Sequence, residues 1–264
     1  MHSPGHTLTT FTLGYRLPRA LAVPLFGDRS RWGQAPIPGD PCWQEWLSII
    51  DKFYMSTQHS GVRKIVNHSG YRVMKLLDLS GKRVLEVGPG TIAHMPWWRG
   101  WPARYDLFDF SASMMAEAVK VLATKNIPHE TYLQSPSANV ALPFPAEHYD
   151  VVVSFYSLEH LHPLGRYMSE MTRILKPGGH LIGAIPCEGG IGWGLGRLLT
   201  TRRWFKKNST IDPDKWVCWE HPNFADAIVR CLDTFLERRH ISYFPFLIPL
   251  IDPNLILKFL YRKI

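Results

Sequence analysis

An apolar run over residues 83–87 contains Glu86 and leads directly into Gly88 and Gly90. Its apolar residues suit a strand buried on both faces, and the glycines let the backbone turn tightly and approach a ligand without interference from Cβ atoms. Asp109 closes a second apolar run about twenty residues later, where a doubly wound sheet holds a carboxylate for ribose hydroxyls. We therefore expect a nucleoside cofactor to bind at this turn.

A second candidate site follows the apolar run 150–155, in the sequence Leu158-Glu159-His160-Leu161. His160 is the preferred catalytic base, because an unperturbed imidazole titrates near neutral pH. A histidine in such a short motif also serves as a helix-start or packing residue. We interpret Glu159 as structural and His221 as a more distant base candidate. No cluster has the spacing of metal ligands, so no metal is expected.

The apolar periodicity predicts the elements that position these residues. Strands are expected at 83–87, 105–108, 131–133, 150–155 and 180–185, alternating with helices such as 113–125 and 164–175. This alternation predicts an α/β fold with a Rossmann-like, doubly wound, mostly parallel sheet. Two further strands, 241–248 and 254–261, are joined by a turn that permits only an antiparallel hairpin, which completes a seven-stranded sheet.

Four segments in this order resemble the class I S-adenosylmethionine-dependent methyltransferases. The segments are 81–91, 109–115, 141–154 and 158–182. The resemblance is closest to the branch that methylates small molecules, of the methyltransferase type 11 kind, and it covers residues 81–186. It implies S-adenosyl-L-methionine as the cofactor. It also implies that the acceptor lies beyond the carboxyl end of strand 150–155, beside His160.

Roles in cofactor binding follow from the same resemblance. Glu86 would orient the amino-acid end of the cofactor, Gly88 and Gly90 would admit it, and Thr91 would lie at the start of the next helix. Asp109 would hold the ribose hydroxyls, because a carboxylate accepts two donors at once. Phe110 or Met114 would flank the adenine. The complete expected set is Glu86, Gly88, Pro89, Gly90, Thr91, Asp109, Phe110, Ser111, Met114, Asn139, Val140 and Phe155.

The sequence departs from the family pattern at two places. Ile92 occupies the position of the third glycine, which narrows the methionine pocket or displaces the helix. The acidic residue that often receives the adenine amino group is missing ahead of the segment 142–144, where the side-chain oxygen of Asn139 could replace it. Both departures favour one alternative, a non-catalytic protein that binds S-adenosylmethionine. Another alternative is an NAD(P)-dependent oxidoreductase, because residues 88–93 also fit the Gly-x-Gly-x-x-Ala dinucleotide pattern.

The flanking regions predict the domain organisation. Residues 1–42 lack periodicity and are interpreted as an irregular arm, whereas 43–264 form the methyltransferase domain. Within it, 43–80 show helical spacing with interruptions near 60–61 and 69–70, as expected for helices that form a lid. Residues 187–222 are interpreted as a glycine-rich insertion near the acceptor. Its basic residues are Arg197, Arg202, Arg203, Lys206 and Lys207, and its tryptophans include Trp193 and Trp204.

The net charge and the composition limit the kinds of acceptor and partner that we expect. A net charge of +8 favours an anionic acceptor, an anionic membrane surface or nucleic acid, although a solvated basic helix face would also explain it. Without an RNA-binding module, nucleic acid is disfavoured, and a small-molecule or lipid-linked acceptor, such as a saccharide methylated on oxygen, is preferred. No apolar run is long enough to span a bilayer, and the four cysteines are scattered. We expect a cytoplasmic protein with peripheral membrane contact, and its oligomeric state stays open.

Overall fold

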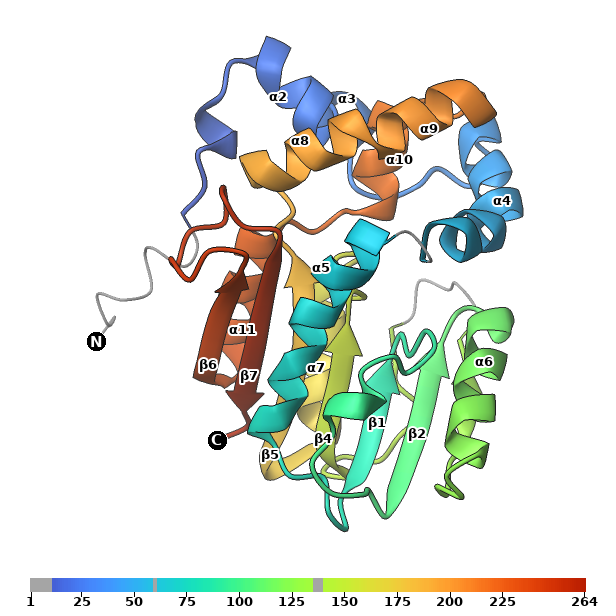
Figure 1. The fold of residues 1–264 in the computed structure, drawn as a ribbon, viewed down its shortest axis with the longest axis vertical. Helices are drawn as coiled ribbons and strands as arrows, with labels where there is room; N and C mark the ends of the chain where they lie inside the picture. The colour runs from blue at the N-terminus through green and yellow to red at the C-terminus, as the bar shows by residue number, and fades with distance from the viewer. Residues whose placement is uncertain (1–10, 59–60, 135–139) are drawn as a thin grey trace.

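The sheet at the centre of the protein has seven strands in the order β3-β2-β1-β4-β5-β7-β6. The computed structural model describes residues 11–58, 61–134 and 140–264. The strands are β1 (Arg83–Val87), β2 (Arg104–Asp109), β3 (Thr131–Leu133), β4 (Tyr149–Phe155), β5 (Leu175–Pro186), β6 (Glu237–Phe244) and β7 (Ile256–Arg262). Neighbours from β3 to β5 are parallel, and β7 is antiparallel to both β5 and β6. The predicted fold class is confirmed (Figure 1).

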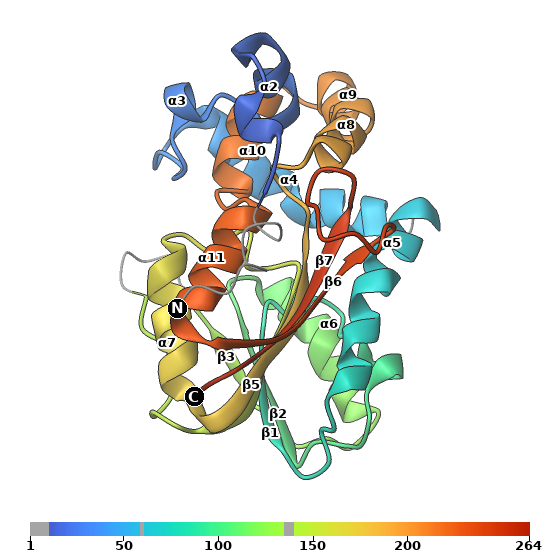
Figure 2. The ribbon, with the colours of Figure 1, turned by 90° about the vertical axis from the view of Figure 1, so that its left-hand side faces the viewer.

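Helices cover both faces of the sheet. On one face lie α5 (Gly61–Tyr71), the 3₁₀ turn η2 (Arg72–Leu76) and α6 (Ala112–Ala123), and on the other lie α7 (Leu164–Ile174) and α11 (Ala225–Phe235) (Figures 1 and 2). Side chains of a strand alternate between the two faces, so Val151 and Val153 pack on the α6 side and Val152 packs on the α7 side. Both faces of β4 are therefore apolar, as its unbroken valine run requires.

A layer of helices lies across the carboxyl ends of the parallel strands (Figures 1 and 2). It comprises α2 (Arg19–Phe26), α3 (Arg29–Trp32), α4 (Pro41–Gln58), α8 (Ile191–Leu199), α9 (Thr201–Asn208) and α10 (Pro213–Glu220). An aromatic cluster joins its N-terminal and insertion segments: the ring centroid of Trp46 lies 5.3 Å from that of Trp216 and 5.9 Å from that of Phe205. Two regions far apart in sequence thus form one cap above the sheet.

Three local expectations are corrected by the structure. The described part of the arm is not irregular, because it contains α2 and α3. The expected break at Ser69-Gly70 is absent: α5 continues to Tyr71, and Gly70 lies so close to Tyr156 that a Cβ atom would be 2.1 Å from the Tyr156 hydroxyl oxygen. That glycine permits close packing rather than ending the helix. The hairpin strand expected at 241–248 ends at Phe244, ahead of the loop that begins with Pro245.

Candidate active site

The glycine turn after β1 has the conformation that a cofactor cradle requires. Gly88 and Gly90 have φ values of 72° and 51°, in the left-handed region that favours glycine. A Cβ atom at Gly88 would lie 2.6 Å from Ser157 Cβ, whereas a Cβ atom at Gly90 would have no other atom within 4 Å. Gly88 therefore allows the turn to pack against the loop after β4. Gly90 leaves open space beside the backbone.

The segment after this turn differs from the expectation. Residues 88–103 are all described and contain no α-helix, only the 3₁₀ turn η3 (Met95–Trp97), so Thr91 is exposed in a turn and does not begin a helix. Ile92 has φ 50° and is buried, a conformation that costs a β-branched residue roughly 1–2 kcal/mol. The backbone at Ile92 therefore keeps the conformation that a glycine would adopt. The helix expected after the turn is absent from this segment.

Glu86 faces the interior and not the open turn. Its carboxylate accepts hydrogen bonds from Tyr105 Oη at 2.7 Å and from His94 Nε2 at 2.8 Å. Trp98 Nε1 donates to His94 Nδ1 at 2.9 Å, and because an indole nitrogen only donates, the His94 proton is on Nε2. The His94 ring also stacks on Phe155, with centroids 4.6 Å apart. Glu86 thus holds the segment behind the turn, and its expected contact with the cofactor stays a prediction.

Asp109 lies beside the glycine turn, as expected. Gly88 N donates to Phe108 O at 3.0 Å, which places the ends of β1 and β2 together. Asp109 Oδ1 accepts from Ser111 N at 2.8 Å, and Ser111 Oγ accepts from Met114 N at 3.3 Å to cap α6. Burial raises the pKa of Asp109 above its usual value. The carboxylate therefore makes a structural turn contact, and its expected contact with ribose hydroxyls stays a prediction.

The residues expected around the adenine are only partly brought together. Phe110 is 40% exposed beside the start of α6, where Met114 also lies. Val140 is buried in the core and Pro89 is buried in the turn. Asn139, the expected replacement for the adenine-binding acid, lies outside the described residues. The adenine contacts therefore stay a prediction.

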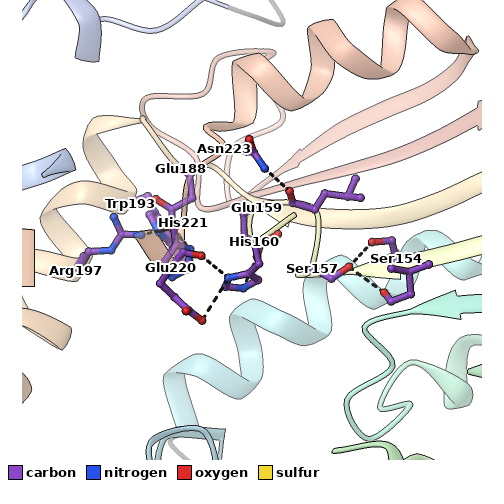
Figure 3. A network of polar contacts seen from close by, with 12 residues as sticks. Ser154, Ser157, Glu159, His160, Glu188, Trp193, Arg197, Glu220, His221 and Asn223 are labelled. Atoms are coloured by element: carbon purple, nitrogen blue, oxygen red, sulfur yellow. Dashed lines mark hydrogen bonds and ion pairs between the residues drawn. The ribbon is translucent and has the colours of Figure 1, made fainter. Parts of the chain in front are cut away.

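His160 lies in a buried polar network beyond β4 (Figure 3). Its Nδ1 donates to Glu220 O at 2.6 Å and lies 3.5 Å from Glu220 Oε1, and its Nε2 is 3.9 Å from Glu159 Oε1. Burial lowers the pKa of His160, but the carboxylates of Glu220 and Glu159 outweigh burial and raise it overall. Asn223 Nδ2 donates to Leu158 O at 2.9 Å and to Leu161 O at 2.6 Å, which holds the loop that carries His160.

The carboxyl group of Glu159 is buried beside His160. Its Oε2 atom has no hydrogen-bond partner among the described residues. Burial raises the pKa of Glu159 to about 7, despite the opposing effect of His160. A pKa raised in this way lies nearer to the range in which general acids and bases operate than that of an ordinary carboxyl.

The insertion supplies the other half of the network. Glu188 forms an ion pair with Arg197 of α8, accepts from Trp193 Nε1 at 2.7 Å and lies 3.1 Å from His221 Nδ1. Burial opposes ionisation of Glu188, but Arg197 and His221 lower its pKa to about 2. Burial lowers the pKa of His221 to about 3, so His221 is too weak a base at neutral pH to act as the alternative to His160.

Several of these residues were not predicted from the sequence. Glu188 lies two residues after the end of β5, and a position just beyond the carboxyl end of a parallel strand was the available signal. No sequence pattern indicated Glu220 or His94. The expected basic surface is also smaller than predicted. Arg197 is paired with Glu188, and Arg202 forms an ion pair with Asp214.

Within the described residues, no group of three or more histidine, cysteine or acidic side chains is arranged to hold a metal ion. Among the same residues, no helix combines the length and the apolar character needed to cross a membrane.

Comparison with known proteins identifies the domain. Residues 85–183 match the methyltransferase domain family. Among solved structures, the N-methyltransferase NodS of Bradyrhizobium japonicum WM9, in complex with S-adenosyl-L-homocysteine, aligns with a TM-score of 0.51 at 15% identity, over 85% of this chain and 99% of that one. An S-adenosylmethionine-dependent methyltransferase from Aquifex aeolicus aligns with a TM-score of 0.53 at 15% identity, over 82% of this chain and 98% of that one. Residues 85–183 are therefore similar to a methyltransferase domain, and the chain has the fold of these S-adenosylmethionine-dependent methyltransferases.

Curated relatives are similar over part of their length. The phthiotriol/phenolphthiotriol dimycocerosates methyltransferase of Mycobacterium leprae (strain TN) is 32% identical over 115 residues, which are 42% of this chain and 40% of that protein. The phosphatidylethanolamine N-methyltransferase of Cereibacter sphaeroides is 32% identical over 140 residues, 53% of this chain and 64% of that protein. The chain thus spans less than two thirds of the length of these relatives.

The raised pKa of Glu159 predicts a pH-dependent stability effect. Because the folded pKa of about 7 exceeds the unfolded value, this group stabilises the fold below about pH 4.3, and the contribution is lost as pH rises through about 7. Glu159→Gln should therefore raise Tm by a few degrees near pH 8 and change it little near pH 5. Thermal unfolding at the two pH values tests this. The exposed Glu117→Gln is the control, and an equal shift at both pH values would contradict the assignment.

Proposed function

We propose that this chain transfers a methyl group from S-adenosylmethionine to a small-molecule or lipid-linked acceptor. We further propose that a hydroxyl group, such as that of a saccharide, is the acceptor atom. The observation that carries the proposal is the open turn at Gly90, flanked by Asp109, at the same end of the sheet as the His160 network. The two curated relatives described above are named for lipid-type acceptors, which supports that part of the proposal.

The residues divide the chemical tasks between them. Bound S-adenosylmethionine supplies an electrophilic methyl group on a sulfonium centre. Asp109 and the glycine turn hold the cofactor, and the cap excludes water. His160 Nδ1 donates to Glu220 O, so the neutral ring keeps a free lone pair on Nε2. During transfer of that methyl group to the acceptor oxygen, His160 Nε2 would accept the hydroxyl proton. Glu159, 3.9 Å away, then stabilises the imidazolium.

The oxidoreductase alternative is disfavoured by the sheet. In this chain β7 is inserted antiparallel between β5 and β6, whereas the dinucleotide-binding fold has six parallel strands in the order 3-2-1-4-5-6. The non-catalytic alternative rests on Ile92, which stands at the position of the third glycine, and on the absence of the acidic residue that receives the adenine amino group. Binding and turnover therefore have to be measured separately.

Calorimetry with S-adenosylmethionine and with NAD tests the cofactor, and release of S-adenosylhomocysteine in the presence of saccharide, amine and lipid acceptors tests the reaction. We expect binding of S-adenosylmethionine alone, and product release that depends on a hydroxyl acceptor. Carbon-13 NMR of the labelled product identifies the methylated atom. Binding of NAD instead would overturn the assignment. Tight cofactor binding without turnover on any acceptor would favour the non-catalytic alternative.

A further inference from the structure

The helix α8 presents apolar side chains outward and its charge inward. Leu195 and Leu199, four residues apart and therefore on one face, are 46% and 54% exposed. Arg197 points to the interior, where its side chain is 4% exposed and pairs with Glu188. A surface helix of a protein surrounded by water normally has the opposite arrangement.

The loop between β6 and β7 exposes a second apolar group. Phe246, Leu247 and Ile248 are 53%, 88% and 47% exposed, and the flanking prolines are exposed as well. Buried Asn254 fixes this loop: its Oδ1 accepts from Phe246 N at 2.9 Å, and its Nδ2 donates to Ile248 O at 3.1 Å and to Leu250 O at 2.7 Å. The apolar side chains are therefore held outward by a defined backbone conformation.

The two apolar groups belong to neighbouring segments of the fold. Gly192 N and Ile191 N, at the start of α8, donate to Asp252 O at 2.7 Å and to Asp252 Oδ1 at 3.2 Å, and both ribbon views place the loop beside α8 (Figures 1 and 2). On the next helix, α9, the cations Arg203, Lys206 and Lys207 are exposed. Leu199 lines one hollow of about 420 Å³ together with Arg203 and Lys206, so the apolar and basic groups are continuous.

We propose that this face docks on an anionic lipid bilayer. The docking face consists of Leu195, Leu199, Phe246, Leu247, Ile248, Arg203, Lys206 and Lys207. Its apolar side chains would enter the boundary of the hydrocarbon region, and its cations would contact the headgroups. The charge is complementary, because the chain has a net charge of +8. A lipid surface, rather than a second copy of this basic chain, is therefore the occupant.

The helix α8 connects the docking face to the candidate active site. The outer face of α8 belongs to the docking face, while Trp193 and Arg197 of the same helix contact Glu188 in the network around His160 and His221. A lipid-linked acceptor held in the bilayer would thus meet the site without leaving the membrane. This part of the inference rests on the proposed function, whereas docking itself does not.

Flotation with vesicles tests the docking face in the full chain. The vesicles contain phosphatidylcholine alone or mixed with phosphatidylglycerol. We expect binding only to the anionic vesicles, weakened by salt. Leu199→Asp/Leu247→Asp should reduce the partition coefficient by roughly tenfold or more, because each leucine loses apolar burial. Arg203→Glu/Lys206→Glu/Lys207→Glu should reduce it by roughly two orders of magnitude.

The controls use exposed residues elsewhere, Leu133→Asp on β3 and Lys125→Glu after α6, which should bind vesicles like the wild type. Calorimetry with S-adenosylmethionine should give the same affinity in every variant, which shows that each one folds. Wild-type protein that binds S-adenosylmethionine but no vesicle would overturn the docking inference and leave the proposed function standing. Self-association of the wild type that Leu247→Asp abolishes would also overturn it, in favour of a second copy as the occupant.

Discussion

His160→Ala should lower the rate of methyl transfer by roughly 10²–10⁴, the usual contribution of a positioned general base. The substitution removes the nitrogen that accepts the hydroxyl proton but leaves the glycine turn and Asp109 intact. Single-turnover release of S-adenosylhomocysteine measures the rate, and calorimetry should show unchanged cofactor affinity. His221→Gln is the matched control, because His221 is too weakly basic for this role at neutral pH.

The pH profile separates a base from a positioning residue. The neutral imidazole is the active form, and the carboxylates of Glu220 and Glu159 raise the pKa of His160. The rate should therefore rise with pH, with a midpoint above the ordinary histidine value of about 6.5. If Glu159 were the base, Glu159→Gln would abolish this rise. Wild-type turnover in His160→Ala would assign His160 to packing alone.

Asp109→Ala should weaken the binding of S-adenosylmethionine by on the order of 1–3 kcal/mol, which is about 5–150-fold in Kd. The substitution removes the carboxylate at the end of β2 that we expect to receive the ribose hydroxyls. Titration calorimetry measures the affinity.

Asp109 also accepts from Ser111 N at 2.8 Å, so the variant could act by loosening the turn. Asp109→Asn provides the control, because the amide oxygen still accepts from Ser111 N while the carboxylate is lost. Similar losses of affinity in Asp109→Asn and Asp109→Ala support a direct contact, whereas a loss only in Asp109→Ala assigns the effect to the turn. Equal affinity in a folded Asp109→Ala variant and the wild type would contradict the ribose assignment.

Local composition predicted the sheet and the turn well. The valine run of β4 is apolar on both faces, which only a strand covered by helices on both sides satisfies, and Gly88 and Gly90 adopt the positive φ values that favour glycine. The family match over residues 85–183 covers the same part of the chain. The sequence did not predict that the helix after β1 is absent. Ile92 there adopts a positive φ, which a β-branched residue normally avoids.

The amino-acid sequence by itself determined the strands along the chain, the mostly parallel sheet with its antiparallel end and the glycine turn after β1, because these depend on the periodicity and backbone preferences of neighbouring residues. Only the tertiary structure decided what the charged residues do. Glu86 accepts hydrogen bonds from His94 and Tyr105, and Arg197 forms a buried ion pair with Glu188. A buried charge needs a partner, and that partner comes from another element of the fold. The acceptor side of the site is therefore built from contacts between the insertion and the loop after β4, and no local pattern specifies them.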